Sequence, residues 1–186
     1  MSEDLIIKHC SPTLAGIKTG NLFSTNYNSI SELRDFIASL NRIFIAKGVY
    51  VLPLKNGNGK VLIYVFRPSL LAADLSDEYA CKLLRAQGYR SLDMNSCIAE
   101  LRQRVSTCSE FPHEIGLFLG YPPEDVYGFI LHKGSRCKCT GCWKVYGDEE
   151  KAVKQFKKFR KCSDIYYSKW LQGTPIQKLT VSAAKM

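Results

Sequence analysis

The sequence predicts an α+β domain in which a small antiparallel sheet of about three strands is packed by six or more helices. Three observations predict this class. Two strand-like runs flank a turn at 56–59, amphipathic helical repeats recur along the chain, and glycine or proline separates the segments. We expect residues 1–173 to form one globular domain and the small, polar residues 174–186 to form a frayed tail.

Two helices are predicted before residue 49. Ser11 and Pro12 predict the start of a short helix, because serine caps helices and proline suits the first helical position. Residues 29–46 predict an amphipathic helix, since apolar side chains recur at intervals of three and four and Gly48 ends the pattern.

A β-hairpin is predicted next. The runs 49–55 and 60–66 flank the sequence NGNG at 56–59, whose residues tolerate positive φ. The second run is apolar without alternation, which predicts a central strand covered on both faces.

The remaining chain is mainly helical. Its periodicity and its proline, glycine and acidic boundaries predict helices at about 76–87, 93–107, 112–119 and 122–131, a third strand at Trp143–Tyr146, and a long helix from Asp148 to about Leu171.

Composition bounds the class of protein. The chain has 186 residues, of which 46% are hydrophobic and 23% charged, as in an ordinary globular protein. Its first residues do not resemble a signal peptide, and its longest apolar runs, such as 61–66, are far shorter than the roughly 20 residues that span a bilayer. We therefore expect a cytoplasmic protein without a membrane association, whose eight cysteines are reduced.

The first candidate site lies around Cys10. A cysteine just before a helix start has a lowered thiol pKa, and Lys18 would lower it further. The same free amides suit an anion, so His9, Ser11, Thr13, Lys18 and Asn21 are candidate ligand-binding residues. The alternative is a capped helix whose cysteine is simply buried.

The second candidate site lies in the 111–125 segment. His113 and Glu114 fall in the first turn of a predicted helix, and Asp125 begins the next one. A thiol, an imidazole and an orienting carboxylate are the parts of many cysteine nucleophiles, so Cys10, His113, Glu114 and Asp125 are candidate catalytic residues. The alternative is that the acids are ordinary first-turn residues and that His113 is a surface side chain.

Cysteines 137, 139 and 142 lie within six residues. They could hold zinc or an iron–sulfur cluster if His132 or Cys162 supplied a fourth ligand. A metal cofactor is therefore possible, but a single CxCxxC does not favour it, and Cys142 can equally begin the strand at Trp143.

The net charge of +9 is unevenly distributed. Residues 1–100 contain 11 Lys and Arg against 9 Asp and Glu, whereas residues 101–186 contain 15 against 8. Most of the excess follows Lys151, on one face of the long helix, where it could hold nucleic-acid phosphates or be merely solvated. Specific DNA binding is not expected, because Glu124 and Asp125 begin the second helix of the 112–131 pair and would repel DNA.

Three segments together resemble an uncharacterised family of bacterial proteins, found chiefly in anaerobes, that carries a domain of unknown function. The segments are HCSPTLAGIKTGNLF at 9–23, FPHEIGLFLGYPPEDVYGFI at 111–130 and CWKVYGDEEKA at 142–152. The resemblance covers nearly the whole chain and implies a single-domain cytoplasmic protein in a cell that keeps its thiols reduced. It supplies no activity, and Cys137 and Cys139 lie outside its motifs. It places several residues in the motifs without a role: His9, Cys10, Lys18, Asn21, His113, Glu114, Asp125 and Trp143.

The leading functional hypothesis joins these segments. Cys10 would be a nucleophile or redox thiol with His113 as its base, and the partner would be a small anionic or carbonyl-containing ligand. The alternatives are a non-catalytic binding module in the same pocket, a metal-binding protein, and non-specific nucleic-acid binding through residues 151–161. Whether the protein is an enzyme stays open, as do its oligomeric state and its substrate.

Overall fold

The computed structural model describes residues 2–108 and 110–182, which form two compact units. The first unit comprises the chain up to Ser69 together with the segment from Lys161 onward, and the second comprises Leu70–Arg160. The expectation of one domain over 1–173 stays a prediction.

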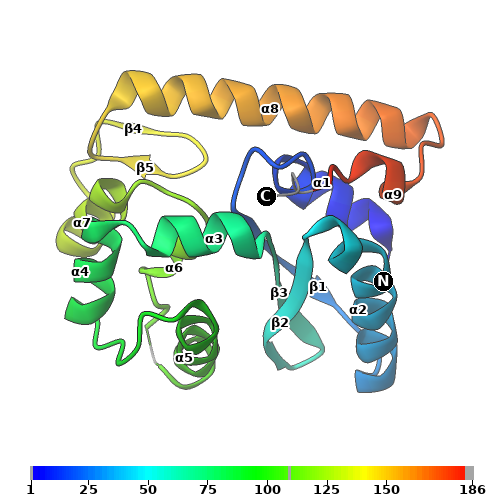
Figure 1. Cartoon of the computed structure of the whole chain (residues 1–186), viewed down its shortest axis with the longest axis horizontal. Helices are drawn as coiled ribbons and strands as arrows, with labels where there is room; N and C mark the ends of the chain where they lie inside the picture. The colour runs from blue at the N-terminus through cyan, green and yellow to red at the C-terminus, as the bar shows by residue number, and fades with distance from the viewer. Residues whose placement is uncertain (1, 109, 183–186) are drawn as a thin grey trace. The chain divides into compact units, whose positions relative to one another are not determined.

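The first unit contains a three-stranded antiparallel sheet in the order β1-β3-β2 (Figure 1). Its strands are β1 (Gly20–Asn26), β2 (Tyr50–Gly57) and β3 (Lys60–Phe66). Strand β3 is central and largely buried, and Asn58 and Gly59 turn the hairpin with positive φ. The α+β class, the hairpin and the central position of the 60–66 strand are confirmed.

The third strand of this sheet is not the predicted one. Strand β1 pairs with β3 along its whole length, from Gly20 opposite Phe66 to Asn26 opposite Lys60. Its sequence alone is too polar to indicate a strand, so its pairing depends on β3. The strand predicted at Trp143–Tyr146 is instead β5 (Lys144–Val145), which pairs with β4 (Cys139–Thr140) in a separate ladder.

Helices cover the sheet of the first unit. Helix α1 (Glu3–Leu14) packs on β1 and β3, and α2 (Ile30–Phe44) packs on β2 and continues into the 3₁₀ turn η1 (Ile45–Lys47). The side chain of Ser29 caps α2 by accepting a hydrogen bond from the Glu32 N–H. The core between these elements is apolar, and it includes Ile6, Ile7, Cys10, Leu14, Phe23, Leu40, Phe44, Val61, Ile63 and Val65.

Two predictions about the ends of the chain are wrong. Helix α1 does not begin at Ser11 but at Glu3, and Pro12 lies inside it, because buried side chains recur at helical spacing well before the proline. The tail expected to be frayed from 174 contains helix α9 (Ile176–Leu179), whose Ile176 and Leu179 are buried in the core. The last predicted tail residues, 183–186, lie outside the described residues.

The second unit consists of helices and the β4–β5 ladder. Aspartates cap two of its helices, since Asp77 accepts from Tyr79 and Ala80 N–H groups and Asp93 accepts from the Ser96 N–H. The helices are α3 (Pro68–Leu75), α4 (Glu78–Ala86), α5 (Met94–Thr107), α6 (Ile115–Phe118), α7 (Pro123–His132) and the first half of α8 (Glu149–Leu171). Within residues 2–108 and 110–182, no helix combines the length and the apolar composition needed to cross a membrane.

Candidate functional site

The buried carboxylate of Asp125, in the first turn of α7, organises one side of the second unit. Its Oδ2 accepts a hydrogen bond from Trp143 Nε1 at 2.7 Å, and its Oδ1 accepts from the backbone N–H groups of Tyr146 and Gly147 at 2.6 and 2.7 Å. These three donors use most of the acceptor capacity of the carboxylate. Asp125 therefore fixes the Trp143 indole and the end of β5 against α7.

A pocket of about 260 Å³ lies beside His113, and we call it the His113 pocket. Most of its wall is apolar or aromatic, and its lining comprises His113, Ile115, Gly116, Tyr121, Asp125, Val126, Phe129, Thr140, Gly141, Trp143 and Lys144. The exposed His113 ring packs on Phe129, with ring centroids 4.8 Å apart. Asp125 already accepts three hydrogen bonds. His113, Thr140 and Lys144 are therefore the lining residues whose side chains can still form hydrogen bonds with a ligand.

A second and larger cavity, of about 580 Å³, shares part of this wall. Tyr121, Asp125 and Trp143 line both cavities. The Tyr121 and Trp143 rings stack with centroids 4.8 Å apart, and Phe156 meets Trp143 edge-on at 4.5 Å. Burial raises the pKa of Tyr121 to about 12, so its phenol stays neutral and donates to the Cys142 carbonyl at 3.2 Å.

The charge of the larger cavity differs from that of the His113 pocket. Four carboxylates line it in addition to Asp125, against one lysine, Lys151; they are Asp74, Asp77, Glu124 and Asp148. Asp77 and Asp148 also cap α4 and α8 by accepting backbone hydrogen bonds. The larger cavity therefore disfavours anions, whereas the His113 pocket offers them donors.

Two glycines let aromatic rings approach the backbone close to the His113 pocket. A Cβ atom at Gly128 would overlap the Tyr146 ring, and one at Gly141 would overlap the Phe156 ring. Glycine is the residue that permits such a close approach. Of these residues, Gly141 lines the His113 pocket, together with Asp125 and the Trp143 ring that Asp125 holds.

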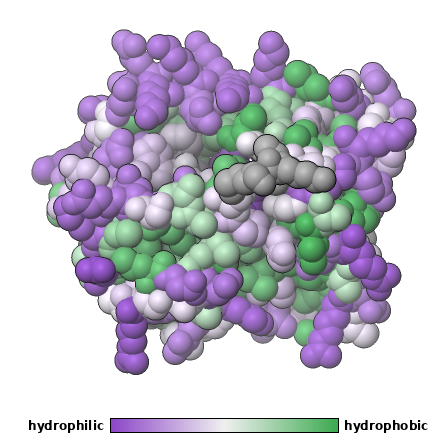
Figure 2. Space-filling view, in the orientation of Figure 1, coloured by the Kyte–Doolittle hydropathy of each residue, from purple (hydrophilic) through white to green (hydrophobic). Residues whose placement is uncertain are grey.

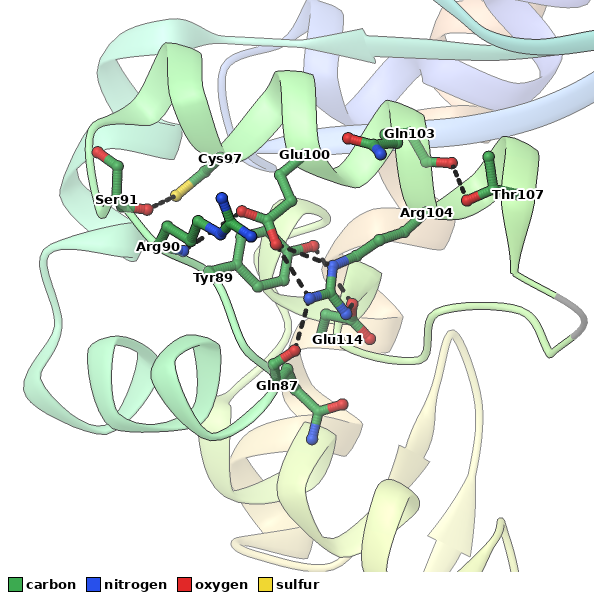
Figure 3. A network of polar contacts seen from close by, with 10 residues as sticks. All are labelled: Gln87, Tyr89, Arg90, Ser91, Cys97, Glu100, Gln103, Arg104, Thr107 and Glu114. Carbon is green, nitrogen blue, oxygen red and sulfur yellow. Dashed lines mark hydrogen bonds and ion pairs between the residues drawn. The ribbon is translucent and has the colours of Figure 1, made fainter.

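Glu114 has a different position from the one that the sequence suggested. Its buried carboxylate accepts from Tyr89 Oη at 3.3 Å and lies 3.6 Å from Arg104 Nη1 (Figure 3). Arg104 also stacks on the Tyr89 ring and donates to the Gln87 carbonyl at 2.6 Å. Glu114 thus connects the start of α6 to α5. Its carboxylate interacts with Tyr89 and Arg104 and not with His113.

Cys10 does not have the surroundings that a nucleophile needs. The expectation of a thiolate at a helix start is wrong, because Cys10 lies inside α1 and its side chain is fully buried in the apolar core. Burial raises the pKa of the thiol well above its ordinary value, and the positive charge of Lys18 opposes this only in part. Cys10 belongs to the first unit and His113 to the second.

We therefore expect Cys10 to resist alkylation at neutral pH in the native protein. The exposed thiols of Cys108 and Cys142 should react first, because a buried, protonated thiol is a poor nucleophile. Mass-spectrometric site mapping after a short iodoacetamide pulse measures this order, and a urea-unfolded sample provides the control in which Cys10 must react. Labelling of native Cys10 as fast as Cys142 would contradict the burial.

The other candidates of the 9–21 segment also have structural partners. The segment's remaining candidates are His9, Ser11, Thr13, Lys18 and Asn21. Thr13 Oγ1 donates to Asn21 Oδ1 at 2.7 Å, Lys18 Nζ donates to the Gly20 carbonyl, and Ser11 Oγ donates to a carbonyl one turn earlier in α1. His9 stacks on Phe23, with centroids 5.3 Å apart. None of the five lines either cavity described above.

The cysteine cluster does not form a metal centre in the described part of the chain. Within residues 2–108 and 110–182, no three His, Cys, Asp or Glu side chains are grouped so that they could hold a metal ion. Burial and the nearby Glu149 carboxylate raise the pKa of Cys139, which disfavours the thiolate that a metal requires. Cys162 belongs to the first unit, whereas Cys137, Cys139 and Cys142 belong to the second.

The sequence did not identify most of the pocket wall. Tyr121, Phe129, Trp143 and Lys144 all lie in the two later motifs, but only Trp143 was singled out, and without a role. The available signal was the density of aromatic residues in these motifs. The link between them is the Asp125 carboxylate, whose partners lie 18 to 22 residues further along the chain.

Comparisons with known proteins gave one finding. The model of the family described as "Protein of unknown function (DUF3793)" matches residues 6–180. The search of curated proteins and the search of solved structures gave no match. The match confirms the resemblance to a family of unknown function, while the assignment of its motifs and its occurrence in anaerobes stay predictions.

Proposed function

The chain belongs to this family of unknown function, DUF3793, and we propose that it binds a small molecule in the His113 pocket. The ligand we infer has a flat apolar body and an anionic or carbonyl end. The proposal retains the binding-module alternative and sets aside catalysis by Cys10, whose burial removes the basis for a nucleophile. A cytoplasmic location, where the eight cysteines stay reduced, belongs to the same proposal.

One observation carries the proposal: two segments separated in sequence line a single pocket. The 111–130 segment supplies His113, Tyr121 and Phe129, and the 139–145 ladder supplies Trp143 and Lys144. Small-molecule sites are concave and mostly apolar, with a few polar groups that orient the ligand. A wall held in place before binding reduces the entropy that the complex must lose.

The polar groups determine the ligand end. His113 offers ring nitrogens, Thr140 a hydroxyl, and Lys144 an ammonium group that already donates to the Gly134 carbonyl at 2.6 Å and keeps two further N–H groups. The one carboxylate in the pocket, Asp125, is occupied by Trp143, Tyr146 and Gly147. A carboxylate or carbonyl oxygen therefore fits these donors, whereas an ammonium group would meet the positive charge of Lys144 and a carboxylate that already accepts three hydrogen bonds.

Three probes of similar shape test this polarity: benzoate, benzamide and benzylamine. We expect benzoate and benzamide to shift the backbone amide signals of pocket residues in a saturable way, and benzylamine to bind at least about tenfold more weakly, because Lys144 repels a second ammonium group and the Asp125 carboxylate already accepts three hydrogen bonds. Two-dimensional ¹H–¹⁵N NMR titration measures all three.

His132 provides a matched control for His113. It stacks on Tyr146 in the same unit with centroids 5.8 Å apart, but it lines neither cavity. We expect His113→Asn to weaken benzoate binding by about three- to tenfold, the value of one typical hydrogen bond, and His132→Asn to leave it unchanged. Equal effects of the two variants, or no saturable shift with any probe, would contradict the proposal.

A further inference from the structure

Helix α8 concentrates most of the positive charge of the protein. Residues 151–163 contain six basic side chains and no acidic one, against a net charge of +9 for the whole chain. All six are exposed, and we call them the basic stripe: Lys151, Lys154, Lys157, Lys158, Arg160 and Lys161. Hydrophilic side chains follow the edge of the space-filling view where Figure 1 draws α8 (Figure 2).

Four of the six stripe residues lie on the side of α8 opposite its buried side chains. The buried side chains of α8 are Ala152 and Phe159, which are separated by seven residues and so share one face. Lys151, Lys154, Lys158 and Lys161 follow each other at intervals of three and four on another face. At 1.5 Å per residue, these four span about 15 Å along the helix axis.

This arrangement opposes the stability of the helix itself. Like charges three or four residues apart repel each other, and every member of the stripe has at least one such neighbour within it. The ion pair that α8 makes at its start, between Lys154 and Glu150, is long at 3.9 Å and highly exposed on both sides. A bound polyanion would remove this repulsion.

We propose that the basic stripe binds the phosphate backbone of duplex nucleic acid without sequence preference. A run of four lysines can approach successive phosphates, and phosphate contacts alone carry no sequence information. The aromatic residues interleaved with the stripe are not exposed for stacking on bases, since Phe159 is buried and Phe156 packs against Trp143, and this disfavours single strands. An anionic membrane is less suitable, because an interfacial helix inserts an apolar face, whereas the part of α8 that carries the stripe, residues 149–161, exposes no large apolar side chain.

Fluorescence anisotropy of a labelled 20-base-pair duplex, titrated with the full chain at several salt concentrations, tests the proposal. We expect weak binding whose logarithm falls with the logarithm of salt at a slope of about −3 to −5, because each neutralised phosphate contributes about −0.9. Two duplexes of unrelated sequence should bind equally.

A charge-matched pair of variants assigns the binding to the stripe. The triple variant Lys154→Gln, Lys158→Gln and Lys161→Gln should bind at least about tenfold more weakly at low salt. Its salt dependence should also be less steep, with a slope smaller in magnitude by about 2–3. The control Lys55→Gln, Lys60→Gln and Lys82→Gln removes the same charge from exposed positions elsewhere and should retain most of the affinity. Both sets keep exposed positions polar, and circular dichroism checks that α8 remains helical.

Three outcomes would overturn the proposal. They are an absence of binding even at low salt, an equal loss in the two triple variants, and binding to phosphatidylserine vesicles that is tighter than binding to the duplex.

Discussion

Replacing Asp125 with alanine is expected to destabilise the second unit by roughly 3–5 kcal/mol, because three donors lose a charged acceptor at once. Trp143 Nε1–H and the N–H groups of Tyr146 and Gly147 are partly buried, so water replaces the carboxylate only in part. The side chain of Asp125 itself is 3% exposed, so its removal also leaves a cavity. Urea unfolding in a Trp170→Phe background reports this unit, since Trp143 is then the sole tryptophan.

Two further variants make this expectation specific. Asp125→Asn keeps one carbonyl oxygen for the Tyr146 and Gly147 donors but faces Trp143 Nε1 with an N–H group, so about half of the loss is expected. The neighbouring Glu124 is exposed, and Glu124→Ala should change the free energy of unfolding by about 0.5 kcal/mol or less. Equal effects of the alanine variants at 124 and 125 would show that the hydrogen bonds of Asp125 do not hold the pocket wall.

Replacing Arg67 with methionine is expected to destabilise the first unit by about 3–5 kcal/mol, because three carbonyls lose a charged hydrogen-bond donor at once. Arg67 is 3% exposed, and its guanidinium donates to the carbonyls of Thr13 at 2.6 Å, Leu14 at 2.7 Å and Val181 at 2.7 Å. Thr13 and Leu14 end α1, where the helix dipole favours a cation, and their carbonyls also accept from the backbone N–H groups of Gly16 and Val181. Burial lowers the pKa of Arg67, but a guanidinium starts high enough to remain charged.

The shape of the guanidinium is part of this expectation. Arg67→Lys keeps the charge, but a single ammonium group cannot donate to several carbonyls at once as the planar guanidinium does. It should therefore recover less than half of the lost free energy of unfolding. Arg34→Met, at an exposed position of α2, serves as the control and should be nearly neutral. Unfolding is followed through Trp170 in a Trp143→Phe background. Full stability of Arg67→Met would contradict the role of Arg67 in joining α1 to the C-terminal segment.

The parts of the fold that could be predicted are those with local signals. Each of these signals lies within a few neighbouring residues, and the structure contains the element that it predicts. They are the NGNG turn, the Ser29 cap, the apolar repeat of α2 and the start of α8 at Asp148. The elements that were missed depend on distant partners. Strand β1 is polar and forms because β3 offers a ladder, and α9 is ordered because Ile176 and Leu179 enter the core of the first unit.

The same distinction explains the candidate site. The serine and proline at 11–12 are a valid cap signal, but the apolar spacing of Ile6, Ile7 and Cys10 extends the helix through them and buries the thiol. His113 and Asp125 were identified as polar residues in dense motifs. Their actual partners, Phe129 and Trp143, could not be inferred, because ring packing and a hydrogen bond across 18 residues depend on the tertiary fold.

The central claim is that a ligand occupies the pocket walled by Trp143. The most direct measurement is a benzoate titration of the Trp170→Phe variant, followed by the fluorescence of Trp143. We predict a saturable change that is weakened by His113→Asn and retained in His132→Asn, while Trp170 in the Trp143→Phe variant gives no saturable signal. A Trp143 signal that stays constant up to saturating probe, or a change of equal size at Trp170, would contradict ligand binding in the His113 pocket.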